Sequence, residues 1–333
     1  LQNNMRLLSA SVRHLGTDIN YEVLENLYAK LEKKVDFFFY THVSRVSQNG
    51  QVYQVETDGD SFSADRCIIS VGRSGSKWME QVCSDLKIPT RSNRVDIGVR
   101  VELPAEIFKH ITDDVYESKI VYRTQKFEDR VRTFCTNPSG EVATEYYDDG
   151  LAVVNGHAYK SKDMKTENTN FALLVSKNFT KPFKTPIEYG KSVARLSNML
   201  CDGRILVQTF GDFLRGRRTT EERLCRNNLI PTLKDAVPGD LSLVLPYRIM
   251  TDIREMLLAL DKVTPGIASD ETLLYGVEVK FYSNKVIVDR NFETSVRGLR
   301  AMGDGASVTR GLQQASANGL CVARAILDKM AAD

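Results

Sequence analysis

Several features that mark special classes of protein are missing from the 333 residues of this chain. No apolar run reaches the ~18 residues that a helix needs to cross a bilayer. The N-terminus also lacks the basic and apolar segments of a secretory signal. Lys and Arg total 45 against 43 Asp and Glu, so the net charge of +2 lacks the basic excess of a dedicated nucleic-acid-binding protein. We therefore expect a soluble, cytoplasmic protein that binds neither membranes nor nucleic acid.

Cysteine is scarce and scattered. The six cysteines form no Cys-x-x-Cys pair and no cluster with His at zinc-site spacing. They are Cys67, Cys83, Cys135, Cys201, Cys225 and Cys321. A disulfide framework is typical of small secreted domains rather than of a chain this long. We expect reduced cysteines, mostly in the core, and no metal site.

The composition that remains is that of a globular protein, with 42% hydrophobic and 26% charged residues. The length suggests about two domains. Residues 1–85 contain a helical pattern at 20–34 and an aromatic, β-branched run at 36–43 that indicates a strand. A β-meander follows through the Asn49-Gly50 turn. The continuous apolar run at 66–71 is typical of a strand buried in an α/β sheet.

The pattern of predicted strands and helices changes between residues 86 and 285. Several strand-like runs and two helical segments there predict an α+β domain of its own. Residues 286–333 return to an α/β pattern, with a short apolar strand at 299–302, a Gly303-Asp304-Gly305 turn and a helix at 312–330.

Two strand-to-turn units, Cys67–Gly75 and Leu299–Gly319, carry the chemistry. In each, an apolar strand ends at glycines, where the backbone can approach a ligand closely. The helix after the second turn offers free amides and a partial positive charge to an anion. Asp304 is placed to accept hydrogen bonds from sugar-like hydroxyls. Glycines after a buried strand are also routine in loops, so either unit alone has a purely structural explanation.

The order of these elements resembles the second half of flavoproteins with the glutathione-reductase-type FAD-binding fold. Ser70-Val71-Gly72 stands where that fold has a strand ending in glycine. Seven segments resemble the uncharacterised FAD-dependent dehydrogenases of prokaryotes, namely His14–Asp18, Val95–Glu102, Arg130–Gly140, Val153–Lys160, Glu167–Ser176, Pro231–Pro246 and Leu273–Ser283. The resemblance implies an α/β FAD-binding domain, incomplete at its N-terminus, in residues 1–85 and 286–333. It also implies a large inserted α+β substrate domain in residues 86–285.

One motif of these flavoproteins is missing. They carry an N-terminal Gly-x-Gly-x-x-Gly unit that admits the pyrophosphate, and this chain contains no such sequence. The resemblance begins at about His14. The module is then truncated, supplied by a separate chain, or lost.

The resemblance implies FAD as the cofactor and assigns roles to individual residues. Val43 would hold adenine through its main chain, and Gly72 would let the cofactor pass closely. Gly303, Asp304 and Gly305 would meet the ribityl and pyrophosphate groups. Arg310, Gly311 and Leu312 would bring helix-start amides to the pyrimidine edge of the flavin.

The function implied is an FAD-dependent oxidoreductase, or its C-terminal portion, that passes hydride or electrons to a small-molecule substrate. NAD(P)H would bind transiently as reductant, because no second dinucleotide fingerprint is present. The alternative is a non-catalytic binding or assembly subunit that has lost the nucleotide module.

Candidate catalytic residues in the inserted domain are Arg100, Arg132, Cys135, His157 and Lys280. Four of them also have a structural explanation: His157 follows a glycine in a turn, Cys135 ends a strand, and Arg100 and Lys280 alternate with apolar neighbours. The densest basic patch contains Arg215, Arg217, Arg218 and Arg223. It could hold a phosphate, including that of a nicotinamide cofactor, or form a solvated loop diluted by Glu221 and Glu222.

Overall fold

The computed structural model describes residues 4–8, 17–147, 150–180, 182–183, 185–282 and 284–332. His14 and Ser283, which belong to segments that carry the resemblance, lie outside these residues. The chain forms two compact units. Unit 1 comprises residues 1–33, 95–177 and 188–280, and unit 2 comprises 34–94, 178–187 and 281–333. Among the described residues, no helix is long and apolar enough to cross a membrane.

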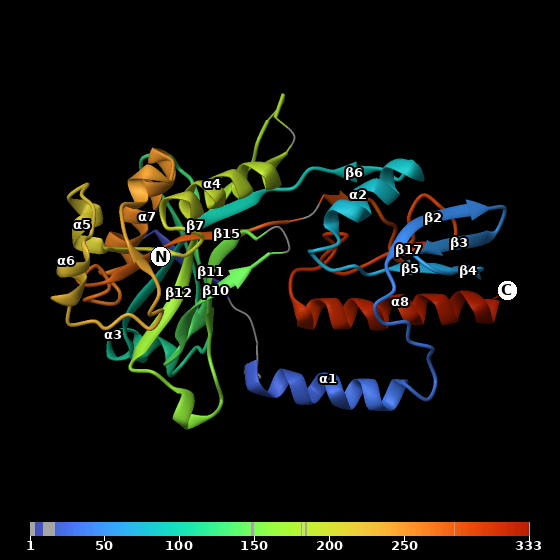
Figure 1. The fold of residues 1–333 in the computed structure, drawn as a ribbon, viewed down its shortest axis with the longest axis horizontal. Coiled ribbons are helices and arrows are strands. Elements are labelled where there is room, and N and C mark those ends of the chain that lie inside the picture. Colours follow the sequence, from blue (N-terminus) through green and yellow to red (C-terminus); the bar gives the residue numbers. More distant parts are fainter. Residues whose placement is uncertain are drawn as a thin grey trace. The chain divides into compact units, whose positions relative to one another are not determined.

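Unit 1 is built on an eight-stranded sheet in the order β1-β8-β9-β12-β7-β15-β13-β14. Its strands are β1 (Met5–Leu8), β7 (Val95–Pro104), β8 (Lys119–Arg123), β9 (Arg130–Asn137), β12 (Asn168–Lys177), β13 (Leu206–Thr209), β14 (Val237–Pro238) and β15 (Leu273–Lys280). Strands β7, β12 and β15 are labelled in Figure 1. Neighbouring strands are antiparallel, except that β13 and β14 are parallel.

Both faces of this sheet are covered. Alternation along β7 places Ile97, Val99 and Val101 on one face and Arg100 on the other, and all are fully buried. On the apolar face, helix α3 (Ala105–Thr112) stacks Phe108 on Phe171 of β12, with ring centroids 5.2 Å apart.

Unit 1 contains further helices and strands beside this sheet. Strands β10 (Glu141–Tyr146) and β11 (Ala152–His157) form a hairpin against its polar face, whereas α7 (Tyr247–Leu260) packs on β7 and β12. Also present are α1 (Thr17–Leu31), α5 (Phe210–Leu214), α6 (Glu221–Cys225) and the short 3-10 turns at Lys162–Met164 and Leu241–Leu243. Helix α4 (Pro186–Leu200) starts in unit 2 and continues into unit 1.

Unit 2 has a parallel pair of strands, β5 (Cys67–Ile69) and β17 (Leu299–Ala301). The predicted meander forms as β2 (Val43–Asn49), β3 (Val52–Thr57) and β4 (Ser61–Ala64). An antiparallel pair, β6 (Thr90–Arg91) and β16 (Lys285–Val286), and the helices α2 (Ser76–Asp85) and α8 (Leu312–Ala332) complete the unit.

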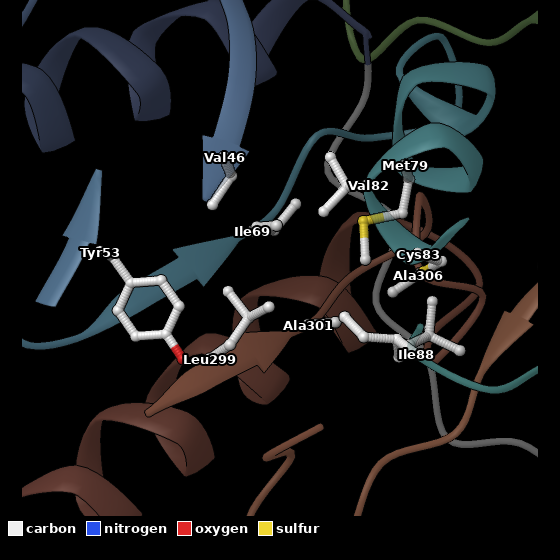
Figure 2. Packing of buried hydrophobic residues seen from close by; sticks show 11 residues of the cluster. Val46, Tyr53, Ile69, Met79, Val82, Cys83, Ile88, Leu299, Ala301 and Ala306 are labelled. Atoms are coloured by element: carbon white, nitrogen blue, oxygen red, sulfur yellow. The ribbon is translucent and has the colours of Figure 1, made fainter. Parts of the chain in front are cut away.

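The apolar core of unit 2 lies between these elements (Figure 2). Tyr53 of the meander, Ile69 of β5, Met79 of α2 and Leu299 of β17 are all buried there. The same cluster includes Val46, Val82, Cys83, Ile88, Val286, Ala301 and Ala306. The core therefore joins residues from both ends of the chain.

The strand predicted at residues 36–43 is wrong except for its last residue, which begins β2. Phe37, Phe38 and Phe39 are 40%, 60% and 62% exposed. Aromatic residues favour strands because they pack on a half-buried pleated surface. Phe38 packs on Phe62 of β4, with ring centroids 4.7 Å apart, but residues 37–42 pair with no strand among the described residues.

The helix predicted at 20–34 forms as α1, but its apolar side is not covered. Leu24 is 65% exposed and Leu27 is 51% exposed. The periodicity thus predicts the helix correctly, whereas the burial that usually accompanies it is not found within the described residues.

Candidate functional site

The two glycine-ended strands singled out in the sequence are neighbours. Strand β17 pairs in parallel with β5, with Leu299 opposite Cys67. The loops that follow them therefore leave the same carboxyl edge, where open α/β sheets bind ligands. A Cβ atom on Gly305 would lie only 2.3 Å from the carbonyl oxygen of Gly72, so the loops touch and need glycine there.

The backbone at this edge leaves open space. Gly72 has φ +66° and Gly303 has φ +76°, a left-handed conformation that favours glycine. A Cβ added to either residue would have nothing within 4 Å. An extended ligand can therefore lie directly against the main chain.

Asp304 organises the loop between β17 and α8. Its carboxylate accepts hydrogen bonds from the Thr309 hydroxyl at 2.7 Å and from the Gly311 amide at 3.0 Å. The Arg73 Nε lies 3.6 Å from the same carboxylate. The side chain thus closes the loop and keeps part of its acceptor capacity on Oδ2.

Two of the three backbone amides expected to face the flavin at the start of α8 are already bonded within the chain. The Gly311 amide donates to Asp304, and the Arg310 amide donates to the Gln314 side chain at 3.0 Å. Helix α8 begins at Leu312, and first-turn amides have no acceptor within their own helix. Of the three residues predicted to present amides, Leu312 is the one whose amide these two bonds do not occupy.

The guanidinium of Arg310 lies over the ring of Tyr282, 4.2 Å from its centroid. It also donates to the Asn93 side chain at 3.4 Å, and Asn93 donates to the Ser307 hydroxyl at 2.7 Å. Asn93 and Tyr282 stand next to the points where the chain leaves and re-enters unit 2. Both crossing segments are therefore anchored on the loop after β17.

Val43 lines an apolar cavity of about 530 Å³ in unit 2. The cavity is bordered by Thr41, His42, Val43, Val46, Val55, Cys67, Ile68, Ile69, Ser70, Val71, Gly75 and Trp78. The walls of the cavity are thus mainly apolar. The buried indole N–H of Trp78 has no acceptor within the described part of the chain.

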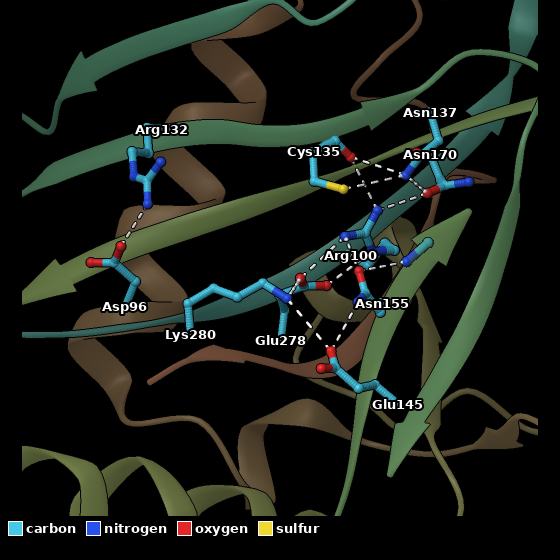
Figure 3. Close-up of polar contacts among 11 residues, drawn as sticks. Asp96, Arg100, Arg132, Cys135, Asn137, Glu145, Asn155, Asn170, Glu278 and Lys280 are labelled. Carbon is cyan, nitrogen blue, oxygen red and sulfur yellow. Dashed lines mark hydrogen bonds and ion pairs between the residues drawn. The ribbon is translucent and has the colours of Figure 1, made fainter. Parts of the chain in front are cut away.

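In unit 1, Arg100 is the centre of a buried polar network (Figure 3). Its Nε and Nη2 donate to the two carboxylate oxygens of Glu278 at 2.9 and 3.1 Å. Nη1 donates to the Asn170 side chain and the Cys135 carbonyl, and Nη2 also donates to Asn155 at 3.4 Å. All five N–H donors of Arg100 are used inside the chain.

Burial disfavours charge on both Arg100 and Glu278, but their ion pair outweighs it. The pKa of Arg100 is raised and the pKa of Glu278 is lowered, so both stay charged. Sequence inspection missed Glu278 and Asn170. Glu278 could have been noticed because it is an acidic residue inside the apolar run of β15. Nothing in the local sequence pointed to Asn170.

Cys135 lies at an irregularity in the pairing of β9 with β12. Its φ is +49°, which is uncommon for a residue with a side chain. The Asn137 amide donates to its carbonyl at 3.1 Å and lies 3.7 Å from its thiol. The turned backbone thereby aims the Cys135 carbonyl at Arg100.

Lys280 and Arg132 lie toward the other end of the polar face. Lys280 pairs in register with Asp96 and bonds to Glu278 at 2.8 Å, and Arg132 bonds to Asp96 at 2.7 Å (Figure 3). Strand β7 starts and β15 ends at this point, so the chain crosses to unit 2 next to these cations.

His157 lies elsewhere, opposite Glu141 in the β10–β11 hairpin, with its ring stacked on Tyr159 at 6.4 Å. The structure therefore brings Arg100, Cys135 and Lys280 together, Lys280 through the shared carboxylate of Glu278, whereas Arg132 pairs with Asp96 and His157 lies in the hairpin.

Comparison with known proteins gives one long match. An uncharacterized protein of Clostridium beijerinckii is 25% identical over 341 aligned positions, which cover 96% of this chain. The chain spans 62% of the length of that relative.

Solved structures give weaker similarities. The salicylate hydroxylase substrate complex has 12% identity and a TM-score of 0.35, covering 90% of this chain and 54% of that one. CtdE in complex with FAD has 12% identity and a TM-score of 0.31, covering 93% and 58%. Scores this low do not establish a shared fold.

The family described as "FAD-dependent protein, C-terminal domain-like" matches residues 94–281, more than half of the chain. This segment contains the polar network around Arg100 and the strands that carry it. The match confirms FAD as the cofactor expected from the sequence, and the chain belongs to this family of FAD-dependent proteins.

Proposed function

We propose that the chain is part of an FAD-dependent oxidoreductase with a glutathione-reductase-type cofactor domain. Unit 2 contributes to that domain, and unit 1 binds a small-molecule substrate. The observation that best supports the proposal is the parallel pairing of β5 with β17, which brings Gly72 together with Gly303–Gly305. Paired glycine loops at one carboxyl edge suit the close passage of a dinucleotide.

Several residues would hold the cofactor. Gly72 and Gly303 let the pyrophosphate region approach the main chain, and Asp304 accepts from the ribityl hydroxyls. The amide of Leu312 heads the 21-residue helix α8 and favours negative charge beside it. Val43 offers its main chain to adenine beside the apolar cavity. When bound, FAD supplies hydride or electron transfer.

A further module completes this domain. Strand β5 pairs only with β17 among the described residues, although parallel sheets are normally larger and covered on both faces. Ile68 in β5 is 46% exposed and borders the apolar cavity. A strand from a Gly-x-Gly-x-x-Gly module, in the same polypeptide or a separate chain, would pair with β5 and hold the pyrophosphate.

Lys280 and Arg132 are the preferred substrate-binding residues of unit 1. Arg132 bonds to Asp96 at the start of β7, and Lys280 ends β15 opposite Asp96, so both lie on the polar face of the sheet in unit 1. Arg100 has no donor left for a substrate, so it positions Glu278, which in turn holds Lys280. We propose that the protein is cytoplasmic and that NAD(P)H binds transiently and reduces the flavin.

The first test is the flavin content of the purified full-length protein. Asp304→Ala and Asp304→Asn should each weaken FAD binding about tenfold or more, since hydrogen bonds to charged groups contribute about 1.5–3 kcal/mol. Asp328→Ala, which removes an exposed carboxylate from α8, is the matched control and should retain full occupancy. Unchanged occupancy in both Asp304 variants would refute the assignment. A wild-type protein that cannot take up FAD would favour the assembly-subunit alternative.

A further inference from the structure

A small hollow in unit 1 gathers four arginine side chains, three of them from the basic patch that the sequence indicated. It has a volume of about 200 Å³ and is lined by Thr209, Gly211, Asp212, Arg215, Arg217, Arg223, Arg226, Asn227, Asp270 and Glu271. Clefts that bury a whole drug-sized ligand measure about 300–1,000 Å³. This hollow is therefore suited to a single small group.

A buried carboxylate at the base fixes one of these arginines. Asp212 is 3% exposed, and its Oδ1 accepts from the Arg217 Nε at 2.5 Å while its Oδ2 accepts from the Thr219 hydroxyl at 2.8 Å. Burial raises the pKa of Asp212, but these two bonds outweigh it and the pKa is lowered. Asp212 is thus neutralised internally, and both Nη groups of Arg217 remain available.

The other three guanidinium groups are each bonded to one partner in the chain, which leaves further N–H donors on each. Arg215 donates to Asp270 at 2.6 Å, and Arg223 donates to the Arg218 carbonyl at 2.8 Å. Arg226 forms an ion pair with Glu222. A Cβ on Gly211 would lie 2.7 Å from Arg215 Nη1, so the glycine lets Arg215 pack against the loop.

The lining of the hollow carries four arginines against Asp212, Asp270 and Glu271, which leaves one net positive charge to attract an anion. Residues 215–226 carry five arginines against two glutamates. Each guanidinium has five N–H donors, and the bonds above use few of them. A carboxylate is satisfied by one guanidinium fork, whereas a phosphate group has three oxygens to share among several forks.

We propose that this hollow binds the phosphate group of a small phosphorylated ligand. The anchoring carboxylates hold the guanidinium groups in place before the ligand arrives, so less side-chain entropy is lost on binding. The site lies within unit 1 and requires neither flavin nor a further module, so its test is independent of the proposed function.

The test is calorimetric titration of the full-length protein with inorganic phosphate, a sugar phosphate, NADP⁺ and NAD⁺. The Arg223→Gln/Arg226→Gln variant keeps Arg217 on Asp212 and so avoids exposing a buried unpaired charge. Arg123→Gln is the matched control, because this exposed arginine lies on β8, away from the hollow.

We expect saturable binding of phosphate that the double variant weakens at least about tenfold and the control leaves unchanged. Preference for NADP⁺ over both NAD⁺ and the sugar phosphate would identify a nucleotide source. Equal affinity for all phosphomonoesters would identify a site that reads phosphate alone. Absence of saturable binding by every probe, or equal weakening in the variant and the control, would overturn the proposal.

Discussion

Asp252 is a fully buried carboxylate in α7 that lies beside a second carboxylate, Asp129. It accepts from the Thr124 hydroxyl at 2.9 Å, and the Lys177 amine lies 3.5 Å away. Burial and the neighbouring Asp129 raise the pKa of Asp252 to about 6. Burial alone would raise the pKa of Asp129 as well, but hydrogen bonds from Arg248 and Lys177 outweigh it and lower that pKa to about 2. As the pH falls, Asp252 therefore takes up a proton well before Asp129 does.

This inequality predicts a pH-dependent stability. Asp252 binds its proton more tightly when folded than when unfolded, so its contribution is complete below about pH 4 and is lost as the pH rises through about 6. The loss should be roughly 2–3 kcal/mol. Asp252→Asn removes this titration and can still accept from Thr124, so it should be more stable than wild type at neutral pH.

Urea unfolding between pH 4 and 8 measures this effect, with Asp328→Asn as an exposed control. If Asp252→Asn shows the same decline in unfolding free energy as wild type, Asp252 does not titrate in this range.

At the residue scale, the sequence could indicate the glycines and Asp304, because a strand that ends in glycine is a local pattern. It could not indicate what Arg100 does, because its partners Glu278 and Asn170 are far away along the chain. Alternation of Arg100 with apolar residues suggested a solvated strand face. The structure instead buries that face under a hairpin.

At the scale of elements, the β10–β11 hairpin packs against the network around Arg100 with very little space. A Cβ on Gly156 would lie 2.2 Å from Asn170 Oδ1 and 2.4 Å from Arg100 Nη1. Gly156→Ala should therefore lower the free energy of unfolding by about 1–3 kcal/mol, the usual cost of overpacking.

Gly59→Ala is the control for this substitution, since Gly59 lies in a turn with nothing within 4 Å of an added Cβ. Chemical denaturation should give that control a change below about 0.5 kcal/mol. Equal stability of the two variants would show that the hairpin does not pack on the network as described.

Elements whose pattern is local were the ones that the sequence predicted well. The Asn49-Gly50 hairpin, the apolar strand at β5 and the helix α8 all form. The strand predicted at residues 36–43 does not form because aromatic content indicates only a preference for packing on a sheet: Phe38 packs on Phe62 of β4 without strand pairing.

At the scale of the whole molecule, the sequence predicted a separate central segment and a return of the chain to the first region. In the structure the chain crosses between units at 94/95 and 280/281, where the sequence suggested boundaries at 85/86 and 285/286. Residues 178–187 also belong to unit 2, although no local sequence pattern indicated this. The order of the eight strands was likewise beyond prediction, because β7 pairs with strands distant in sequence.

In the function that we propose, FAD lies against the glycines at the carboxyl edge of β5 and β17. The most direct measurement is the dissociation constant of FAD for full-length Gly303→Ala compared with Gly50→Ala. Both glycines have positive φ and open space at the Cβ position, so each substitution should cost a similar roughly 1–2 kcal/mol in stability. We expect FAD to bind at least about tenfold more weakly, a loss of about 1.4 kcal/mol, in Gly303→Ala alone. Equal FAD affinity in the two variants would contradict this expectation.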